Sequence, residues 1–161
     1  MDVGAEPSDI ERVYRARYSA FIALATASTG DVAEATDVVQ EAFATALRKR
    51  RRFRSEGTLE AWLCRIVLNK ARDRRRKRSR RPFLTTADPA ISTNGYEADA
   101  AVRAVLAELP ERQRETIFLR YYADLDYAGI AAVLGISPGT VGATLTAAHT
   151  RLRERIERGR E

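Results

Sequence analysis

The sequence has almost none of the residues that build disulfides, metal centres and nucleophilic active sites. Cys64 is the only cysteine and His149 the only histidine among 161 residues, so neither an intramolecular disulfide nor a Cys/His metal cluster can form. It also has no glycine-rich phosphate-binding loop and no nucleophile paired with a histidine at a plausible spacing. The sequence therefore predicts a protein that is not an enzyme and has no metal or cofactor.

Long apolar runs are missing as well. The longest uncharged stretch, residues 128–150, is interrupted by glycine, proline and several threonines, whereas a membrane-spanning helix requires continuous apolarity. The N-terminal residues show no basic region followed by an apolar run, which is the pattern of a secretion signal. We therefore expect a cytoplasmic protein that does not insert into a membrane.

The alternating pattern of a half-buried strand is almost absent, and apolar residues recur instead at helical spacing. This periodicity predicts an all-α protein with two small helical domains, over residues 8–81 and 98–157. Residues 82–97 are rich in Pro, Ser and Thr without apolar periodicity, and we expect them to form a flexible linker. In the first domain, Asp31 and Glu34 have the spacing of a capping box, and Thr58 is placed to cap a third helix.

Charge is distributed very unevenly along the chain. Residues 1–47 carry a net charge of −5, residues 48–81 of +13 and residues 82–161 of −2. The basic segment predicts a surface for a polyanion, because each neutralised phosphate releases condensed counterions. Apolar residues recur at helical spacing over residues 59–71, so this segment is expected to be a helix rather than a disordered tail. Trp62 lies within the apolar stripe and is expected in the core.

Residues 126–153 have the pattern of a helix-turn-helix. Gly135 stands where a left-handed residue ends the first helix, and Ser137 followed by Pro138 begins the second. Apolar residues then recur at helical spacing over residues 141–152 and can pack on the first helix. This motif places its second helix in the major groove of DNA, but here that helix has almost no charge to offer.

The sequence predicts two helical domains: the first ends in a tryptophan-bearing basic helix and the second in a helix-turn-helix. This arrangement resembles the extracytoplasmic-function class of sigma factors in the bacterial sigma-70 family. Residues 35–43 look like the acidic helix with which this family docks on polymerase, although an acidic residue is usual where Thr36 stands. Residues 53–69 are similar to its promoter-melting segment, and residues 109–114 with the helix-turn-helix look like its domain 4. The order and spacing of the three stretches make the resemblance specific.

The resemblance implies a sigma factor, which directs core RNA polymerase to promoters and initiates transcription without catalytic activity of its own. Its partners would be core polymerase, through the β′ clamp helices and the β flap, and promoter DNA. The residues implied to bind core polymerase are Asp37, Gln40 and Glu41. Those implied to bind the minus-10 element are Phe53, Arg54, Ser55, Glu56, Arg65, Asn69, Lys70, Arg72, Arg74, Arg75 and Arg76.

The second helix of the helix-turn-helix departs from the family pattern, which typically has basic residues where Gly142, Thr144, Ala147 and His149 stand. Threonine and histidine can form hydrogen bonds with bases, but they cannot form the bidentate arginine–guanine pair. We therefore predict weak binding of a minus-35 duplex. The side chains left to bind that element are Thr140, Thr144, Thr146, His149, Arg151 and Arg153.

Three explanations of this uncharged helix stay open: it reads DNA shape or an A/T-rich element, a partner assists or covers it, or its small residues pack against protein. The partner would be an anti-sigma factor or a second transcription factor, and it ranks first because Gly142, Ala143 and Ala147 suit an interface better than base recognition. Two other functions also stay open. One is a sigma-like adaptor or antagonist that binds polymerase without initiating, and the other is a free-standing helix-turn-helix regulator.

Overall fold

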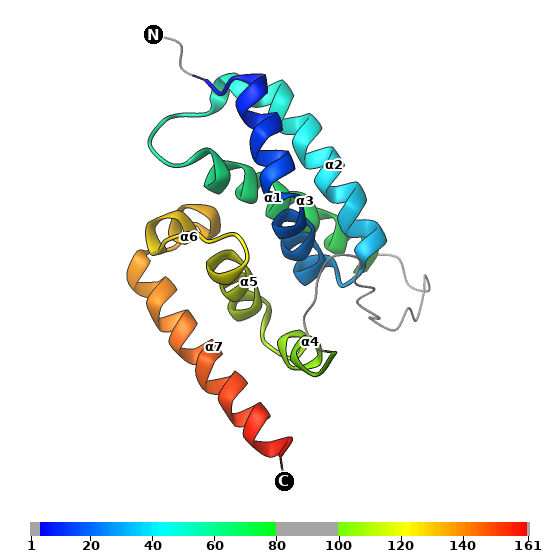
Figure 1. Cartoon of the computed structure of the whole chain (residues 1–161), viewed down its shortest axis with the longest axis vertical. Coiled ribbons are helices and arrows are strands. Elements are labelled where there is room, and N and C mark those ends of the chain that lie inside the picture. Colours follow the sequence, from blue (N-terminus) through cyan, green and yellow to red (C-terminus); the bar gives the residue numbers. More distant parts are fainter. Residues whose placement is uncertain (1–3, 80–99, 161) are drawn as a thin grey trace.

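The computed structural model describes residues 4–79 and 100–160, and every regular element in these two ranges is a helix (Figure 1). The predicted linker over residues 82–97 lies outside the described residues. The predicted all-α class is confirmed. The elements are α1 (Pro7–Thr29), α2 (Val32–Lys49), a short 3-10 turn (Arg50–Arg52), α3 (Leu59–Ser79), α4 (Ala100–Ala107), α5 (Glu111–Tyr121), α6 (Tyr127–Leu134) and α7 (Pro138–Arg158).

The N-terminal unit, formed by α1, α2 and α3, packs around an apolar core. Ile10 and Phe21 of α1, Val38 of α2, and Leu63 and Leu68 of α3 are each at most 1 % exposed. Each helix packs against the other two, and Figure 1 shows α1 and α2 running side by side with α3. The three helices form because each can bury one apolar side against the other two.

Local chemistry sets the helix ends in this unit. Gly30 ends α1 in the left-handed conformation, with a φ of 77° that glycine adopts without steric cost. The Asp31 carboxylate then accepts hydrogen bonds from the N–H groups of Ala33 and Glu34, as predicted for the cap of α2. The reciprocal half of the predicted capping box is not formed, because the Glu34 carboxylate pairs with Arg78 of α3 instead.

The C-terminal unit, formed by α4 to α7, contains the predicted helix-turn-helix in α6 and α7. Asp126 caps α6 by accepting a hydrogen bond from the N–H of Gly129, and Gly135 ends the helix with a φ of 67°. Ser137 accepts a hydrogen bond from the N–H of Thr140 at the start of α7. The largest apolar side chains buried in this unit include Leu119, Ile130, Val141 and Leu145.

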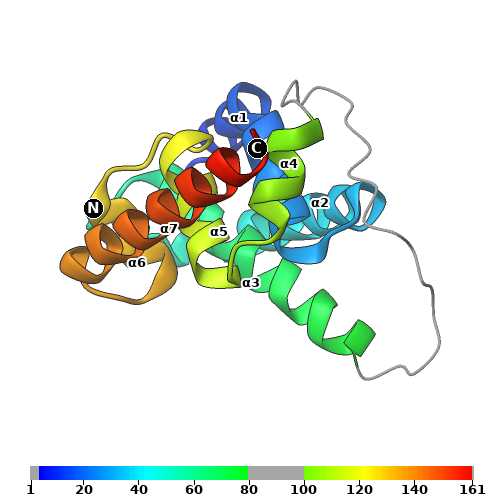
Figure 2. The same cartoon turned by 90° about the horizontal axis from the view of Figure 1, so that it is seen from below.

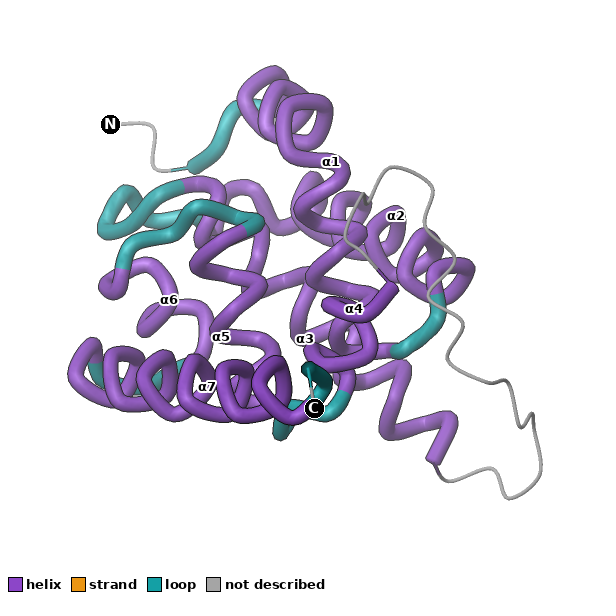
Figure 3. Tube along the Cα trace, turned by 60° about the horizontal axis from the view of Figure 1, so that its bottom comes forward, coloured by secondary structure: helices purple, strands orange, loops and turns teal. Residues whose placement is uncertain are grey.

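The two units pack directly against each other, a contact that the prediction of a flexible linker did not include. α5 lies against α1 and α6 lies against α3, and Figures 2 and 3 show the C-terminal helices alongside the N-terminal unit. Buried apolar residues of both units form one continuous cluster. Within the described ranges, no single helix is long and apolar enough to cross a membrane, and α6 and α7 would qualify only as a pair bent by 97°.

Candidate nucleic-acid interface

Helix α3 carries most of the predicted minus-10 residues, and its long polar side chains point in three directions. The first direction is toward solvent, where Arg65, Asn69 and Arg76 are exposed. Their spacing of four and seven residues keeps them on one side of the helix. We call these three residues the outer face of α3. Arg76 pairs with Asp73 on the same side, and Lys70 lies at the edge of the outer face and is partly buried.

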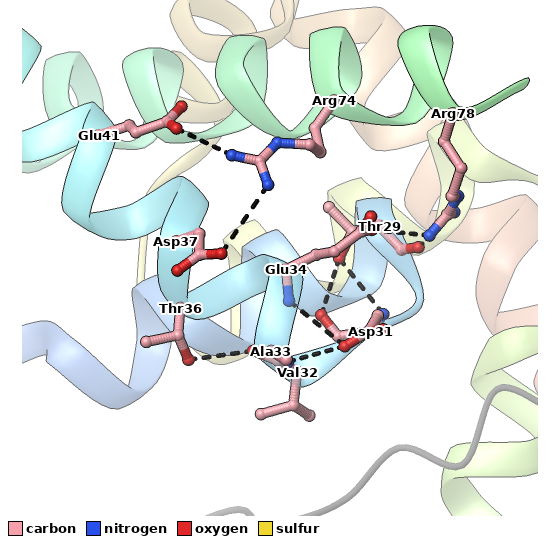
Figure 4. Close-up of polar contacts among 10 residues, drawn as sticks. All are labelled: Thr29, Asp31, Val32, Ala33, Glu34, Thr36, Asp37, Glu41, Arg74 and Arg78. Carbon is pink, nitrogen blue, oxygen red and sulfur yellow. Dashed lines mark hydrogen bonds and ion pairs between the residues drawn. The ribbon is translucent and has the colours of Figure 1, made fainter. Parts of the chain in front are cut away.

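The second direction is toward α2, whose carboxylates bind two arginines of α3 (Figure 4). Nη2 of Arg74 donates a hydrogen bond to Oε1 of Glu41 at 2.8 Å, and its Nη1 lies 3.9 Å from Oδ2 of Asp37. Arg78 donates to the Glu34 carboxylate at 2.7 Å and to a carbonyl oxygen at the end of α1 at 2.6 Å. These arginines therefore tie α3 to the two helices before it.

The predicted polymerase-binding residues of α2 lie next to this pairing. Asp37, Gln40 and Glu41 are all exposed and fall within about one helical turn. Two of the three are the carboxylates that Arg74 bridges. Sequence analysis placed Arg74 on DNA and Asp37 and Glu41 on polymerase, and it did not predict that the structure brings them together.

The third direction is toward α5 in the C-terminal unit. Arg72 donates from Nε and Nη2 to the two carboxylate oxygens of Glu115, at 3.1 and 2.6 Å. Glu115 is completely buried, at 0 % exposure. One turn away, Nη2 of Arg75 lies 2.5 Å from the Glu111 carboxylate. Two predicted phosphate-binding residues are thus occupied by carboxylates of the other unit.

The acidic partners in these two pairs differ in their pKa values. Burial raises the pKa of Glu115 above its usual value in spite of the hydrogen bonds and charge of Arg72. Burial acts on Glu111 in the same direction. The hydrogen bond and charge of Arg75, together with a hydrogen bond to Glu115 and the charge of Arg72, outweigh burial and hold the pKa of Glu111 below its usual value. The hydrogen bond to Glu115 raises the pKa of Arg72. Glu115 therefore needs its arginine partner to stay ionised while it is buried.

The loop before α3 carries the remaining predicted minus-10 residues. The Thr58 hydroxyl accepts a hydrogen bond from the N–H of Ala61 and caps α3 as predicted. Phe53 packs edge-on against Trp62, with ring centroids 5.6 Å apart, and both rings are partly buried against the core. Residues 54–56 are exposed. The two rings therefore stand next to an exposed polar loop, and Trp62 lies two helical turns before Asn69 on the same side of α3.

The threonines of α7 use their hydroxyl groups within their own helix. Thr144, Thr146 and Thr150 each donate a hydrogen bond to the carbonyl oxygen four residues earlier, at 2.7, 3.0 and 3.0 Å. The Thr140 hydroxyl lies 2.9 Å from that of Ser137. A hydroxyl whose proton is bound to the backbone keeps only acceptor capacity for a base. These threonines therefore present mainly methyl groups and acceptor oxygens to solvent.

Two tyrosines that sequence analysis missed flank α7. Oη of Tyr121, in α5, lies 2.8 Å from Nε2 of His149, so the histidine is engaged within its own unit. A Cβ at Gly142 would lie 3.4 Å from Cε2 of Tyr127, so this ring lies close against the helix. Tyr121 is 56 % and Tyr127 45 % exposed. Their position beside a predicted helix-turn-helix was the signal that could have revealed them. The predicted minus-35 residues Arg151 and Arg153 are exposed farther along α7.

Reactive groups are scarce in the part of the chain that the structure describes. There, no group of three or more His, Cys, Asp and Glu side chains is placed to hold a metal ion. Cys64 is 2 % exposed, and burial raises the pKa of its thiol to about 12. A buried thiol with a raised pKa is unreactive, so Cys64 serves as a small core residue.

Comparisons with known proteins identify the family of the chain. Residues 13–81 match the family Sigma-70 region 2, and residues 99–152 match Sigma-70, region 4. The chain is 34 % identical over 149 residues to the RNA polymerase sigma-H factor of Pseudomonas aeruginosa, covering 81 % of the chain and 72 % of that protein. It is 30 % identical over 148 residues to the ECF RNA polymerase sigma-E factor of Escherichia coli K12, covering 80 % and 75 %. The chain belongs to the extracytoplasmic-function sigma factors of the sigma-70 family.

Two solved structures share the fold of this one. The sigma factor RpoE of Bartonella quintana, solved with the anti-sigma factor NepR, has a TM-score of 0.78 at 27 % identity and covers 92 % of this chain and 97 % of that one. CnrH, solved with the cytosolic domain of CnrY, has a TM-score of 0.71 at 25 % identity and covers 95 % and 90 %. Sigma factors are transcription initiation factors without catalytic activity of their own. As a sigma factor, the chain works with core RNA polymerase and promoter DNA.

Proposed function

We propose that residues 8–81 bind core polymerase and then bind and open the minus-10 element. Residues 98–157 form the domain that lies near the minus-35 element, and residues 82–97 are the linker between the two. The observation that supports this division most is the outer face of α3. Arg65 and Arg76 are exposed there on either side of Asn69. Arginines hold phosphates without reading sequence, and an amide supplies both a donor and an acceptor to a base edge.

The loop before α3 is the proposed site for a flipped base of the opened strand. Unstacking a base costs a few kcal/mol, which stacking and edge hydrogen bonds must offset. Phe53 and Trp62 form an aromatic pair at this place, and the exposed Arg54, Ser55 and Glu56 offer polar groups. Asn69 lies two turns along the same side of α3. Lys70, and Arg72, Arg74 and Arg75 once released from their carboxylates, would add phosphate contacts.

Core polymerase binding is assigned to Asp37, Gln40 and Glu41 on α2. All three are exposed within one turn and suit a contact with basic helices of the β′ clamp. Arg74 holds the carboxylates of Asp37 and Glu41 on one side of α2. A basic partner helix would compete with Arg74 for them, so docking on polymerase and release of Arg74 are coupled in this proposal.

The C-terminal unit is assigned a weak contact with the minus-35 element through Thr140, Thr144, Thr146, His149, Arg151 and Arg153, assisted by the polymerase β flap and by a second protein. The hydroxyls of Thr144 and Thr146 are bound to the backbone of α7, and His149 is bound to Tyr121. The assisting protein would be another transcription factor, whereas an anti-sigma factor would instead contact and cover the same unit. Because polymerase and promoter are inside the cell, the cytoplasm is the proposed location.

One experiment tests the whole proposal. The full chain is added to core polymerase from the same organism, and the 5′ ends of RNA made from genomic DNA are mapped. Discrete start sites that share a minus-10 sequence would support a sigma factor that initiates. Polymerase binding without initiation would identify an antagonist instead. Specific duplex binding without any polymerase binding would point to a free-standing regulator, and it would refute the assignment of α2.

A further inference from the structure

Besides the apolar residues that the two units bury together, the contact between them includes ion pairs and hydrogen bonds at several separate places. α3 contributes Arg72, which holds both oxygens of Glu115, and Arg75, which pairs with Glu111. α1 contributes Arg17, whose Nη1 lies 3.1 Å from the Asp124 carboxylate.

A further hydrogen bond runs in the opposite direction across the same contact. Arg114 of α5 donates from Nε to the carbonyl oxygen of Ala27 in α1, at 2.7 Å. Together with the ion pairs, it sets the position of α5 on both α1 and α3. A contact held at so many points has one defined docking geometry.

The pairs on α3 have the chemistry of a phosphate complex. An arginine guanidinium binds carboxylate and phosphate through the same fork of parallel N–H donors. In this structure, Nε and Nη2 of Arg72 already donate to the Glu115 carboxylate. The donors of Arg72 cannot hold a DNA phosphate in this fork while Glu115 occupies it.

We propose that Glu111 and Glu115 act as an internal substitute for DNA phosphates: they hold the two units closed and mask Arg72 and Arg75 until the units separate. The inference depends on the proposed function only where it assigns these two arginines to DNA. It adds that the C-terminal unit, besides its place at the promoter, restrains DNA binding by the N-terminal unit. DNA and the α5 carboxylates therefore compete for the same side of α3.

We call the pairs Glu115–Arg72 and Glu111–Arg75 the latch between the two units. The burial of Glu115 makes this latch reversible. An ion pair removed from water loses most of its Coulombic gain to desolvation of the two charges. When the units separate, Glu115 and Arg72 both regain water, so opening costs much less than the short distances of the pair suggest. The geometry thus specifies how the units dock without locking them permanently.

The test uses the full chain with the double substitution Glu111→Gln and Glu115→Gln, which keeps shape and removes both charges. The matched control is Glu154→Gln with Glu157→Gln, which removes two charges from exposed positions of α7 in the same unit. X-ray scattering gives the radius of gyration, and fluorescence anisotropy gives the affinity for a labelled single-stranded oligonucleotide. The single substitution Glu111→Gln, at a carboxylate whose side chain is 34 % exposed, serves if the double variant does not fold.

We expect the interface variant to have a larger radius of gyration than the wild type and to bind the oligonucleotide roughly tenfold more tightly, since the binding-competent open form becomes the major one. The control should stay as compact as the wild type and change its affinity by about twofold at most. An unchanged radius of gyration in the interface variants would refute the latch. If the radius of gyration increases but the affinity for the oligonucleotide rises no more than in the control, the masking of Arg72 and Arg75 is refuted. Start-site mapping with polymerase tests the proposed function separately.

Discussion

Helices α3 and α7 are equally long, at 21 residues each, but they distribute polar side chains in opposite ways. α3 has basic side chains on every side that is not core, so one group reaches solvent while others bind α2 and α5. α7 has no charged side chain before Arg151, and three of its threonine hydroxyls, those of Thr144, Thr146 and Thr150, donate to its own backbone. In the proposed function, this difference makes α3 the main contact with DNA and the helix-turn-helix the weaker one.

The largest expected difference comes from removing two basic residues from each helix. The double substitution Arg65→Gln and Lys70→Gln on α3 should weaken promoter binding by the polymerase complex about a hundredfold, because each lost phosphate contact costs roughly tenfold at moderate salt. Arg151→Gln with Arg153→Gln on α7 should cost less than about threefold. Filter binding at several salt concentrations measures both. Equal losses from the two helices would contradict the comparison.

A smaller effect is expected from the amide on the outer face of α3. Asn69→Ala should slow promoter opening about tenfold, since hydrogen bonds to a base edge are lost, and it should leave core binding unchanged. Permanganate reactivity of unpaired thymines reports opening. Gln40→Ala on α2 is the reciprocal control, because it should weaken core binding but not opening at saturating polymerase. Parallel loss of both properties in Asn69→Ala would remove the residue from its assigned role.

A gain of function should follow from giving α7 one of the charges it lacks. Ala147 is exposed, and Ala147→Arg should raise the affinity of the full chain for a minus-35 duplex by roughly threefold to tenfold through one new phosphate or base contact. Ala44→Arg adds the same charge at an exposed position of α2 and is the control. If both variants bind duplex equally well, the added charge acts through net charge alone and α7 does not face DNA.

The smallest effect concerns the glycine within α7. Gly142→Ala should raise the free energy of unfolding by up to about 1 kcal/mol, because an interior glycine weakens a helix and the new methyl group would meet Tyr127 at an ordinary contact distance of 3.4 Å. Chemical denaturation measures the change. Gly30→Ala is the control and should destabilise, since Gly30 has a φ of +77°. Destabilisation by Gly142→Ala would show that the helix needs glycine there to accommodate the tyrosine ring.

Many features of the fold were predictable from neighbouring residues alone. The end of α6 at Gly135 and the start of α7 at Ser137 depend on the backbone chemistry of a few adjacent positions, and both predictions are confirmed. The buried side of α3 was predictable because apolar residues recur at helical spacing. Only the Asp31 half of the predicted capping box is formed, because the Glu34 carboxylate pairs with Arg78, 44 residues away.

The candidate site was predictable in its residue types but not in its pairing. Helical periodicity places Arg72 and Arg74 on particular sides of α3, but it does not say which element faces each side. Their partners Glu115 and Glu41 are 43 and 33 residues away in the sequence. The contact of Tyr121 with His149 spans 28 residues and was equally out of reach.

The sequence by itself determined the all-α class, the helix-turn-helix, the concentration of positive charge before residue 82 and the lack of charge in most of α7. These properties depend on composition, on periodicity and on residues close together in the chain. Only the tertiary structure decided which side chains of α3 reach solvent, which ones bind α2, and which ones hold the two units together. The reason is physical: an ion pair requires two charges within a few ångströms, and that proximity is created by the packing of helices that are distant in sequence.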